Sequence, residues 1–166
     1  MKIVISESQY QKLIESKEEP KVLRIPSLKL FSNDWFLLQK FLERRGNPPY
    51  SIGGDLDLRK TPIESLGNLI SVGEDLDLRH SPIESLGNLV SVGGNLDLYN
   101  TPIESLGNLQ SVGGYLDLQG TLIKSLGNLQ SVGGDLYLYE TPISEKYSEE
   151  EIRQMVNVDE IIYLKL

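Results

Sequence analysis

The sequence predicts an α/β solenoid, in which short parallel strands and irregular return arms repeat as stacked coils. A unit of 20 residues, GGDLDLRKTPIESLGNLISV, starts at Gly53, and close copies of it start at Gly73, Gly93, Gly113 and Gly133. Apolar residues hold the same positions in every copy, and amphipathic segments flank the repeats. A unit this short cannot bury its own apolar side chains, so it stacks on its neighbours. We therefore expect four full coils and a partial fifth, with α-helical caps at both ends.

Each coil is predicted to contain one strand and one return arm. Leu56 and Leu58 alternate with Asp57, so a short strand would place both leucines inside and the aspartate outside. The glycine pair before the strand indicates either a backbone with positive φ or a close approach between coils. Apolar residues then recur at every third position, at Ile63, Leu66, Leu69 and Val72. This spacing suits a 3₁₀ or extended arm better than an α-helix.

The repeats resemble the leucine-rich repeat family. The frame L-x-L-x-x-N-x-L maps onto Leu56, Leu58, Thr61 and Ile63 and recurs in the next three copies, and the period matches the short bacterial class of about 20 residues. The resemblance implies parallel strands on a concave face. The buried asparagine of the family is replaced here by a hydroxyl residue at Thr61, Ser81, Thr101, Thr121 and Thr141. A hydroxyl has a single donor, so we expect a hydroxyl ladder. A second candidate ladder is formed by the amides of Asn68, Asn88, Asn108 and Asn128.

The first 19 residues precede the solenoid and its cap. Residues 1–19 are expected to form a strand at 3–5 and a helix that starts at Ser6. This peptide resembles the leader-like starts of some proteins of large tailed phages. Leu13-Ile14-Glu15 also resembles the sites that phage prohead proteases cut. An ordinary amphipathic helix is the alternative interpretation.

Residues 20–52 are predicted to form an N-terminal helical cap. Asn33 or Asp34 precedes a helix over residues 35–45, and Gly46 follows as its stop signal. One side of this helix carries Trp35, Leu38, Phe41 and Leu42. Because a terminal coil needs an amphipathic cover, we expect this side to pack on the open end of the first coil.

Residues 53–142 are predicted to form the solenoid, and residues 143–166 are predicted to form a C-terminal cap of a helix and a strand. Ser148 and Glu151 form a capping-box pattern at the start of a helix that runs to about residue 156. Its apolar side would contain Ile152, Met155 and Val156. The last six residues, which are mostly apolar, predict a strand that continues the main sheet and so protects its edge.

Composition excludes several classes of protein and site. The chain has no cysteine, so it can form neither disulfides nor thiolate metal sites. Its start lacks the pattern of a secretory signal, and no apolar run approaches the ~18 residues of a membrane span. We expect a cytoplasmic protein, placed in the host cytoplasm or the virion if phage-encoded. The net charge of the chain is −8, and the repeats are acidic, with four Lys/Arg against twelve Asp/Glu. An acidic surface argues against nucleic-acid binding.

The concave strand face is the candidate binding surface. Strands that stack in parallel about 4.8 Å apart place identical positions in columns. The predicted partner-binding residues are Asp55, Asp57, Arg59, Asp75, Asp77, Arg79, Asp97, Tyr99, Tyr115, Asp117, Tyr137 and Tyr139. Their acidic members would steer a basic partner, and their tyrosines would supply contact area. The alternative is that duplication copied the aspartates and that water and the two arginines screen their repulsion.

The sequence favours a protein-binding module with no catalytic residues, metal ligands or cofactors. His80 is the one histidine and lacks a nucleophile or second base. The aspartates project from one side of a sheet, whereas calcium needs six to eight oxygen ligands around it. Two other functions stay open: a structural or packaged phage virion protein with a passive solenoid, and an acidic decoy of a nucleic-acid-binding protein.

Overall fold

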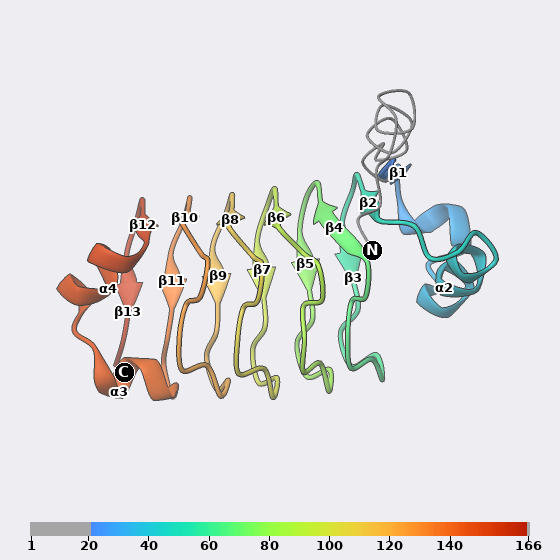
Figure 1. The fold of residues 1–166 in the computed structure, drawn as a ribbon. Helices are drawn as coiled ribbons and strands as arrows, with labels where there is room; N and C mark the ends of the chain where they lie inside the picture. Colours follow the sequence, from blue (N-terminus) through green and yellow to red (C-terminus); the bar gives the residue numbers. More distant parts are fainter. Residues whose placement is uncertain (1–20, 166) are drawn as a thin grey trace, which may run out of the picture.

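The computed structural model describes residues 21–165, which form a solenoid of stacked coils around one continuous apolar core (Figure 1). Each repeat makes one coil, and each strand inside the two sheets pairs in parallel with the strands of the coils before and after it. The predicted solenoid is therefore confirmed. The predictions for residues 1–19 lie outside the described residues.

Two parallel sheets run along the solenoid. Sheet A contains β1 (Leu23–Ile25), β2 (Tyr50–Ile52), β4 (Leu69–Val72), β6 (Ser91–Val92), β8 (Ser111–Val112), β10 (Ser131–Val132) and β12 (Asn157–Val158). Sheet B contains β3 (Leu56–Asp57), β5 (Leu76–Asp77), β7 (Leu96–Asp97), β9 (Leu116–Asp117), β11 (Leu136–Tyr137) and β13 (Ile162–Tyr163).

The prediction of one strand per coil was therefore wrong, because each coil forms two. Ser91-Val92, expected within a return arm, pairs in register with the same residues of the neighbouring copies. A buried backbone needs hydrogen-bond partners, and an identical coil on each side supplies them wherever the chain is extended. The third side of the coil has only isolated bridges, such as Ser65 with Ser85, and the described repeats contain no 3₁₀ helix.

The core consists of the apolar positions that the repeat pattern predicts. In the third copy, Leu96, Leu98, Ile103, Leu106 and Leu109 are each 0% exposed. Full burial of such a side chain contributes roughly 1.5–3 kcal/mol. Because every coil repeats these positions, the core extends without a break from Ile25 to Ile162.

The glycine pairs mark the corner between sheets A and B. A Cβ atom added to Gly93 would lie 2.1 Å from the carbonyl oxygen of Gly73, and one on Gly113 would lie 2.1 Å from that of Gly93. Neither residue has positive φ. Of the two explanations for the pair, close approach between coils is therefore correct for its first glycine. The second position of the pair accepts a side chain in one coil, as Glu74.

The buried hydroxyl residues stack in a column but do not bond along it. Thr101 Oγ1 donates to the carbonyl oxygen of Leu98 at 2.8 Å, within its own coil. Equivalent bonds close the same turn at Ser81, Thr121 and Thr141. The expected ladder was wrong in this respect, because a hydroxyl has one proton and the carbonyl three residues earlier lies nearest to it. In the asparagine column, Asn88 Nδ2 donates to Asn68 Oδ1 at 2.9 Å, whereas Asn128 Nδ2 donates to a backbone carbonyl.

The N-terminal end of the solenoid carries η1 (Leu28–Phe31), a 3₁₀ turn, and helix α2 (Trp35–Glu43). Asp34 is the N-cap of α2, and its carboxylate accepts a hydrogen bond from the Leu37 amide at 3.0 Å. The helix buries Trp35, Leu38 and Leu42, as its apolar spacing predicts.

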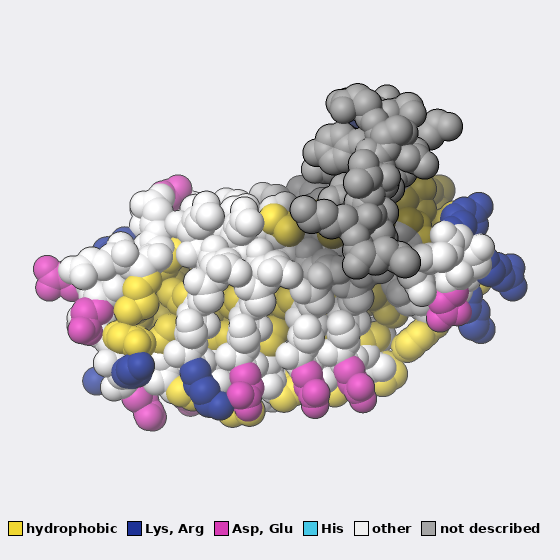
Figure 2. Space-filling view, in the orientation of Figure 1, with side chains coloured by type: hydrophobic (Ala, Val, Ile, Leu, Met, Phe, Trp, Pro, Cys, Tyr) yellow, Lys and Arg dark blue, Asp and Glu magenta, His cyan; other side chains and the backbone are white. Residues whose placement is uncertain are grey.

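The C-terminal end carries helices α3 (Pro142–Lys146) and α4 (Glu149–Met155), followed by β12 and β13. The capping box of Ser148 and Glu151 is confirmed, and β13 continues sheet B as predicted. Met155 was wrongly placed in the core, since it is 45% exposed at the last residue of α4. Lys and Arg side chains gather at the α2 end, and the opposite end shows Asp and Glu side chains mixed with some Lys and Arg (Figure 2).

Helices that could cross a membrane are absent from residues 21–165: none of those described combines the required length with an apolar composition.

The glycine corner gives a direct test of coil spacing. Gly93→Ala is expected to lower the free energy of unfolding by about 3 kcal/mol, because its methyl group would overlap a backbone oxygen that cannot rotate away. Gly54→Ala is the matched control, since its Cβ would lie 3.6 Å from the nearest backbone atom, an ordinary contact. Urea denaturation measures both, and equal stabilities of the two variants would contradict the close approach.

Candidate binding face on sheet B

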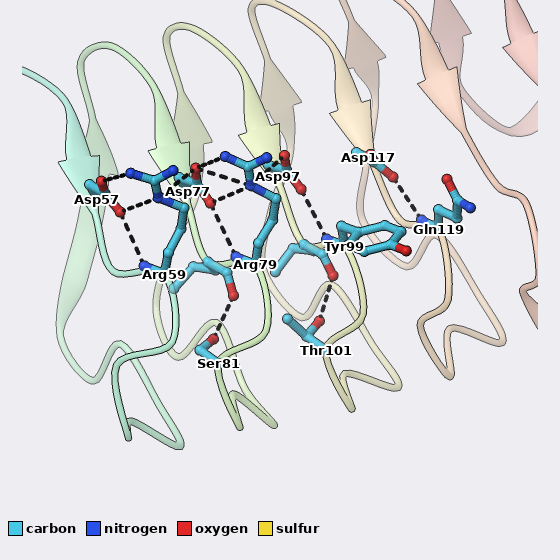
Figure 3. A network of polar contacts seen from close by, with 12 residues as sticks. Asp57, Arg59, Asp77, Arg79, Ser81, Asp97, Tyr99, Thr101, Asp117 and Gln119 are labelled. Carbon is cyan, nitrogen blue, oxygen red and sulfur yellow. Dashed lines mark hydrogen bonds and ion pairs between the residues drawn. The ribbon is translucent and has the colours of Figure 1, made fainter.

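The candidate site is the outer surface of sheet B with the residue before and the turn after each of its strands, here called the sheet B face (Figure 3). All twelve residues predicted to bind a partner lie on it. The strand register stacks Asp57, Asp77, Asp97 and Asp117 in one column, which continues as Tyr137 and Tyr163.

The aspartates of this column stabilise the turn at the end of each strand. Asp97 Oδ1 accepts a hydrogen bond from the backbone amide of Tyr99 at 3.0 Å, and Asp117 Oδ1 accepts one from Gln119 at 2.8 Å. Asp57 and Asp77 make the same bond to the residue two positions later. Aspartate favours this local turn because its short carboxylate reaches the backbone two residues on.

Two arginines relieve the repulsion between the stacked carboxylates in the first half of the face. Arg59 lies 2.6 Å from Asp57 and 3.4 Å from Asp77, measured between side-chain nitrogen and oxygen atoms. Arg79 repeats the arrangement, at 2.6 Å from Asp77 and 3.1 Å from Asp97. Each guanidinium therefore bridges two coils, and Figure 3 shows the resulting chain of alternating charges. Arg59 and its neighbouring carboxylates are partly exposed, so each pair stabilises the fold only modestly.

The chain of alternating charges stops after Arg79. Tyr99 and Gln119 occupy the arginine position in the next two coils, so Asp117 has no ion pair among the described residues. The Asp97 side chain is only 9% exposed. Burial raises the pKa of Asp97 to about 6 and outweighs the neighbouring Arg79, and burial also raises the pKa of Asp117.

The neighbouring column joins coils through side chains. Asp75 Oδ1 accepts a hydrogen bond from the Asn95 amide of the next coil at 2.7 Å, and Asn95 Oδ1 accepts one from Tyr115 at 2.9 Å. Asp55 and Asp135 make the same contact to the coils that follow them. These acidic and amide side chains therefore support the stacking of coils. This structural role was not among the predictions, although these side chains recur just before each predicted strand.

Tyrosines dominate the second half of the face. The rings of Tyr137 and Tyr163 stack with centroids 4.7 Å apart and planes at 2°. Tyr115 meets Tyr137 edge-on at 6.1 Å, and Tyr139 lies 5.9 Å from Tyr163. All four are half-buried, so each presents part of its ring to solvent. We call these four residues the tyrosine cluster.

Tyr163 belongs to this cluster but is not among the twelve residues predicted from the sequence. The predicted final strand, which was expected to continue the main sheet, could have indicated a role for Tyr163. The register of this strand, however, follows only from the pairing of Tyr163 with Tyr137 in the structure. The Tyr137 hydroxyl donates to Asp135 Oδ2 at 3.1 Å. Burial, together with this bond and the charge of Asp135, raises the pKa of Tyr137 to about 12.

Two further features lie on or beside the sheet B face. Tyr99 packs edge-on against His80 at 5.3 Å, and His80 Nδ1 lies 3.2 Å from Asn100 Nδ2. A cleft of about 530 Å³ separates η1 from β3 and is lined by Lys29, Asp55 and Glu74, among others. Within residues 21–165, no cluster of His, Cys, Asp and Glu has the arrangement of a metal site.

Comparison with known proteins gives no relative: no protein-family model, no curated protein and no solved structure matches the chain.

The burial of Asp97 predicts a dependence of stability on pH. Because its pKa is higher in the folded chain than in the unfolded chain, Asp97 stabilises the fold at low pH, and this contribution is lost as pH rises from about 4 to about 6. A shift of about two pKa units corresponds to at most ~3 kcal/mol.

Asp97→Asn should remove this slope and keep the turn, because the asparagine oxygen can still accept the Tyr99 amide. Urea denaturation between pH 4 and pH 7 measures the effect, with Glu64→Gln as a control at an exposed position. An unchanged slope in Asp97→Asn would show that other groups govern the dependence.

Proposed function

We propose that this protein is a protein-binding module and that it binds a basic partner on the sheet B face. The tyrosine cluster is the observation that carries the proposal. Tyrosine is enriched at the energetic centres of interfaces because it buries a large area at low entropic cost and keeps a polar tip. A row of four half-buried rings on one surface supplies such a centre.

The charges near the cluster favour a basic partner over an acidic one. Asp117 lies one coil before Tyr137 in the same column, and Asp135 bonds to the Tyr137 hydroxyl. The exposed faces of tyrosine rings attract ammonium and guanidinium groups, and neighbouring carboxylates strengthen that attraction. The net charge of −8 would also speed the encounter with a basic protein.

The two halves of the face would contribute differently. In the first half, Arg59 and Arg79 compensate the aspartates, and Asp75 accepts a backbone amide. Those carboxylates already have partners within the chain and would mainly steer the approach of the basic protein. In the second half, Tyr99, Gln119 and Tyr139 take the arginine position, so contact energy would concentrate at the tyrosines.

We also propose that the repeats belong to the leucine-rich repeat class and that the terminal helices act as caps. The leucine frame of each copy supports the first assignment, and the buried residues Trp35 and Ile152 in α2 and α4 support the second. The same proposal includes a cytoplasmic location and no catalytic activity.

The test is affinity capture from the source cell with three baits: the wild type, the triple variant Tyr115→Ser/Tyr137→Ser/Tyr139→Ser, and a control. The control carries Leu122→Ser, Glu64→Gln and Glu84→Gln, at exposed positions outside the sheet B face. One hot spot is worth about 2 kcal/mol, so the tyrosine variant should retain its partner at least ~30-fold less well than the control does.

Circular dichroism must first show that all three baits are folded. Equal retention of the same partner by the tyrosine variant and the wild type would overturn the proposal. If added salt releases nucleic-acid-binding proteins equally from both, charge alone holds them and the decoy function is favoured. If no bait retains a partner, the structural virion function is favoured.

A further inference from the structure

The exposed large hydrophobic side chains of the described residues concentrate at the two ends of the solenoid. Val22, Leu30, Phe36 and Leu37 lie at the N-terminal end, and Met155 and Ile161 at the C-terminal end. The only other member of this group is Leu122, in a return arm. Exposed apolar side chains that lie together mark interaction sites in soluble proteins.

The N-terminal end combines this apolar surface with positive charge. A cavity of about 330 Å³ is lined by Phe31, Leu37, Lys40, Phe41, Arg44 and Arg45, with no acidic residue among them. Arg45 lies over the Phe41 ring at 3.7 Å, and Phe31 packs edge-on against the same ring. Residues 21–52 hold six Lys/Arg against two Asp/Glu.

The C-terminal end has the opposite charge. Residues 143–165 hold three Lys/Arg against six Asp/Glu, and all six carboxylates are exposed. They surround Met155 and Ile161 in sequence, which are 45% and 53% exposed. Glu149 is paired with Arg153 and Glu151 caps α4, whereas no side-chain bond of Glu150 or Glu160 is found among the described residues.

The ends of the sheets lie at the same places. Sheet A begins with β1 and finishes with β12, so each of these strands has a neighbour on one side only within residues 21–165. An edge strand beside an apolar patch is suited to meet another chain. Figure 2 shows Lys and Arg side chains gathered at the α2 end, whereas the α4 end shows Asp and Glu side chains together with some Lys and Arg.

From this complementarity we infer that the protein associates head to tail with a second copy of itself, the basic apolar α2 end of one chain docking on the acidic α4 end of the next. The occupant of the α2 cavity is a second copy because the chain itself carries the matching surface, apolar side chains within a group of carboxylates. Such an interface joins two different surfaces, so it extends into rows of molecules unless it closes into a ring.

The test uses sedimentation velocity of the full chain over a range of concentrations. The wild type should form larger species as its concentration rises and lose them as salt is added. Lys40→Glu/Arg44→Glu changes the α2 end, and Glu150→Lys/Glu160→Lys changes the α4 end. Each variant alone should associate at least tenfold more weakly than the wild type.

An equimolar mixture of the two variants should associate again, because each keeps one native end that matches the native end of the other. This recovery also shows that both variants are folded. Glu64→Lys/Glu84→Lys is the matched control, since it reverses the same number of exposed carboxylates in the return arms and should associate as the wild type does.

Three results would overturn the inference. A wild type that stays monomeric throughout the range excludes the interface. Association that the α2 variant abolishes and the α4 variant leaves unchanged would indicate a symmetric contact between two α2 ends. Association that the return-arm control weakens as much as the end variants would show a general effect of charge.

Discussion

The register between coils is the constraint on which the rest of the structure depends. Strands of neighbouring copies pair residue for residue, and at the sheet corner the chain passes so close to its copy that a Cβ on Gly93 would lie 2.1 Å from a carbonyl oxygen. A slip of one residue would expose the leucines and bury the aspartates. Three features therefore require the same period of 20 residues: the pairing of strands between coils, the close approach of the glycines at the corner, and the burial of the leucines in the core.

A fixed register turns each position of the repeat into a column, and a column of aspartates needs neutralisation. The chain supplies this in two ways, by backbone amides at Asp57 and its copies and by guanidinium groups that reach the next coil. In the first half of the sheet B face, the aspartates therefore mainly stabilise the coils and are not free acidic groups. After Arg79 the same position holds Tyr99, Gln119 and Tyr139, so the chain of alternating charges ends and tyrosine rings pack on one another instead.

Much of this architecture could be predicted from the sequence, because buried apolar positions recur with a fixed period. The coils, the core and the helix start at Ser148 follow from side-chain pattern alone, and the pattern limits the other helix start to Asn33 or Asp34, of which the structure has Asp34. The second strand of each coil does not, since two extended residues are too few to show alternation and owe their pairing to the adjacent copy. The contacts of Asp75 and the place of Tyr163 in the tyrosine cluster likewise depend on which atoms the register brings together.

Copying of one unit explains the coils but not the places where the copies differ. Drift alone would scatter the changes over all exposed positions, yet the glutamate of the return arm is kept in three consecutive copies, at Glu64, Glu84 and Glu104. The tyrosines instead gather on one side of one sheet, close enough for ring contacts. The ends differ from the repeats for another reason, because the last coil has no copy to cover it and its surface has to be closed by other residues. The two end segments are opposite in net charge, with six Lys/Arg against two Asp/Glu in residues 21–52 and three against six in residues 143–165, and the inferred head-to-tail association rests on this difference.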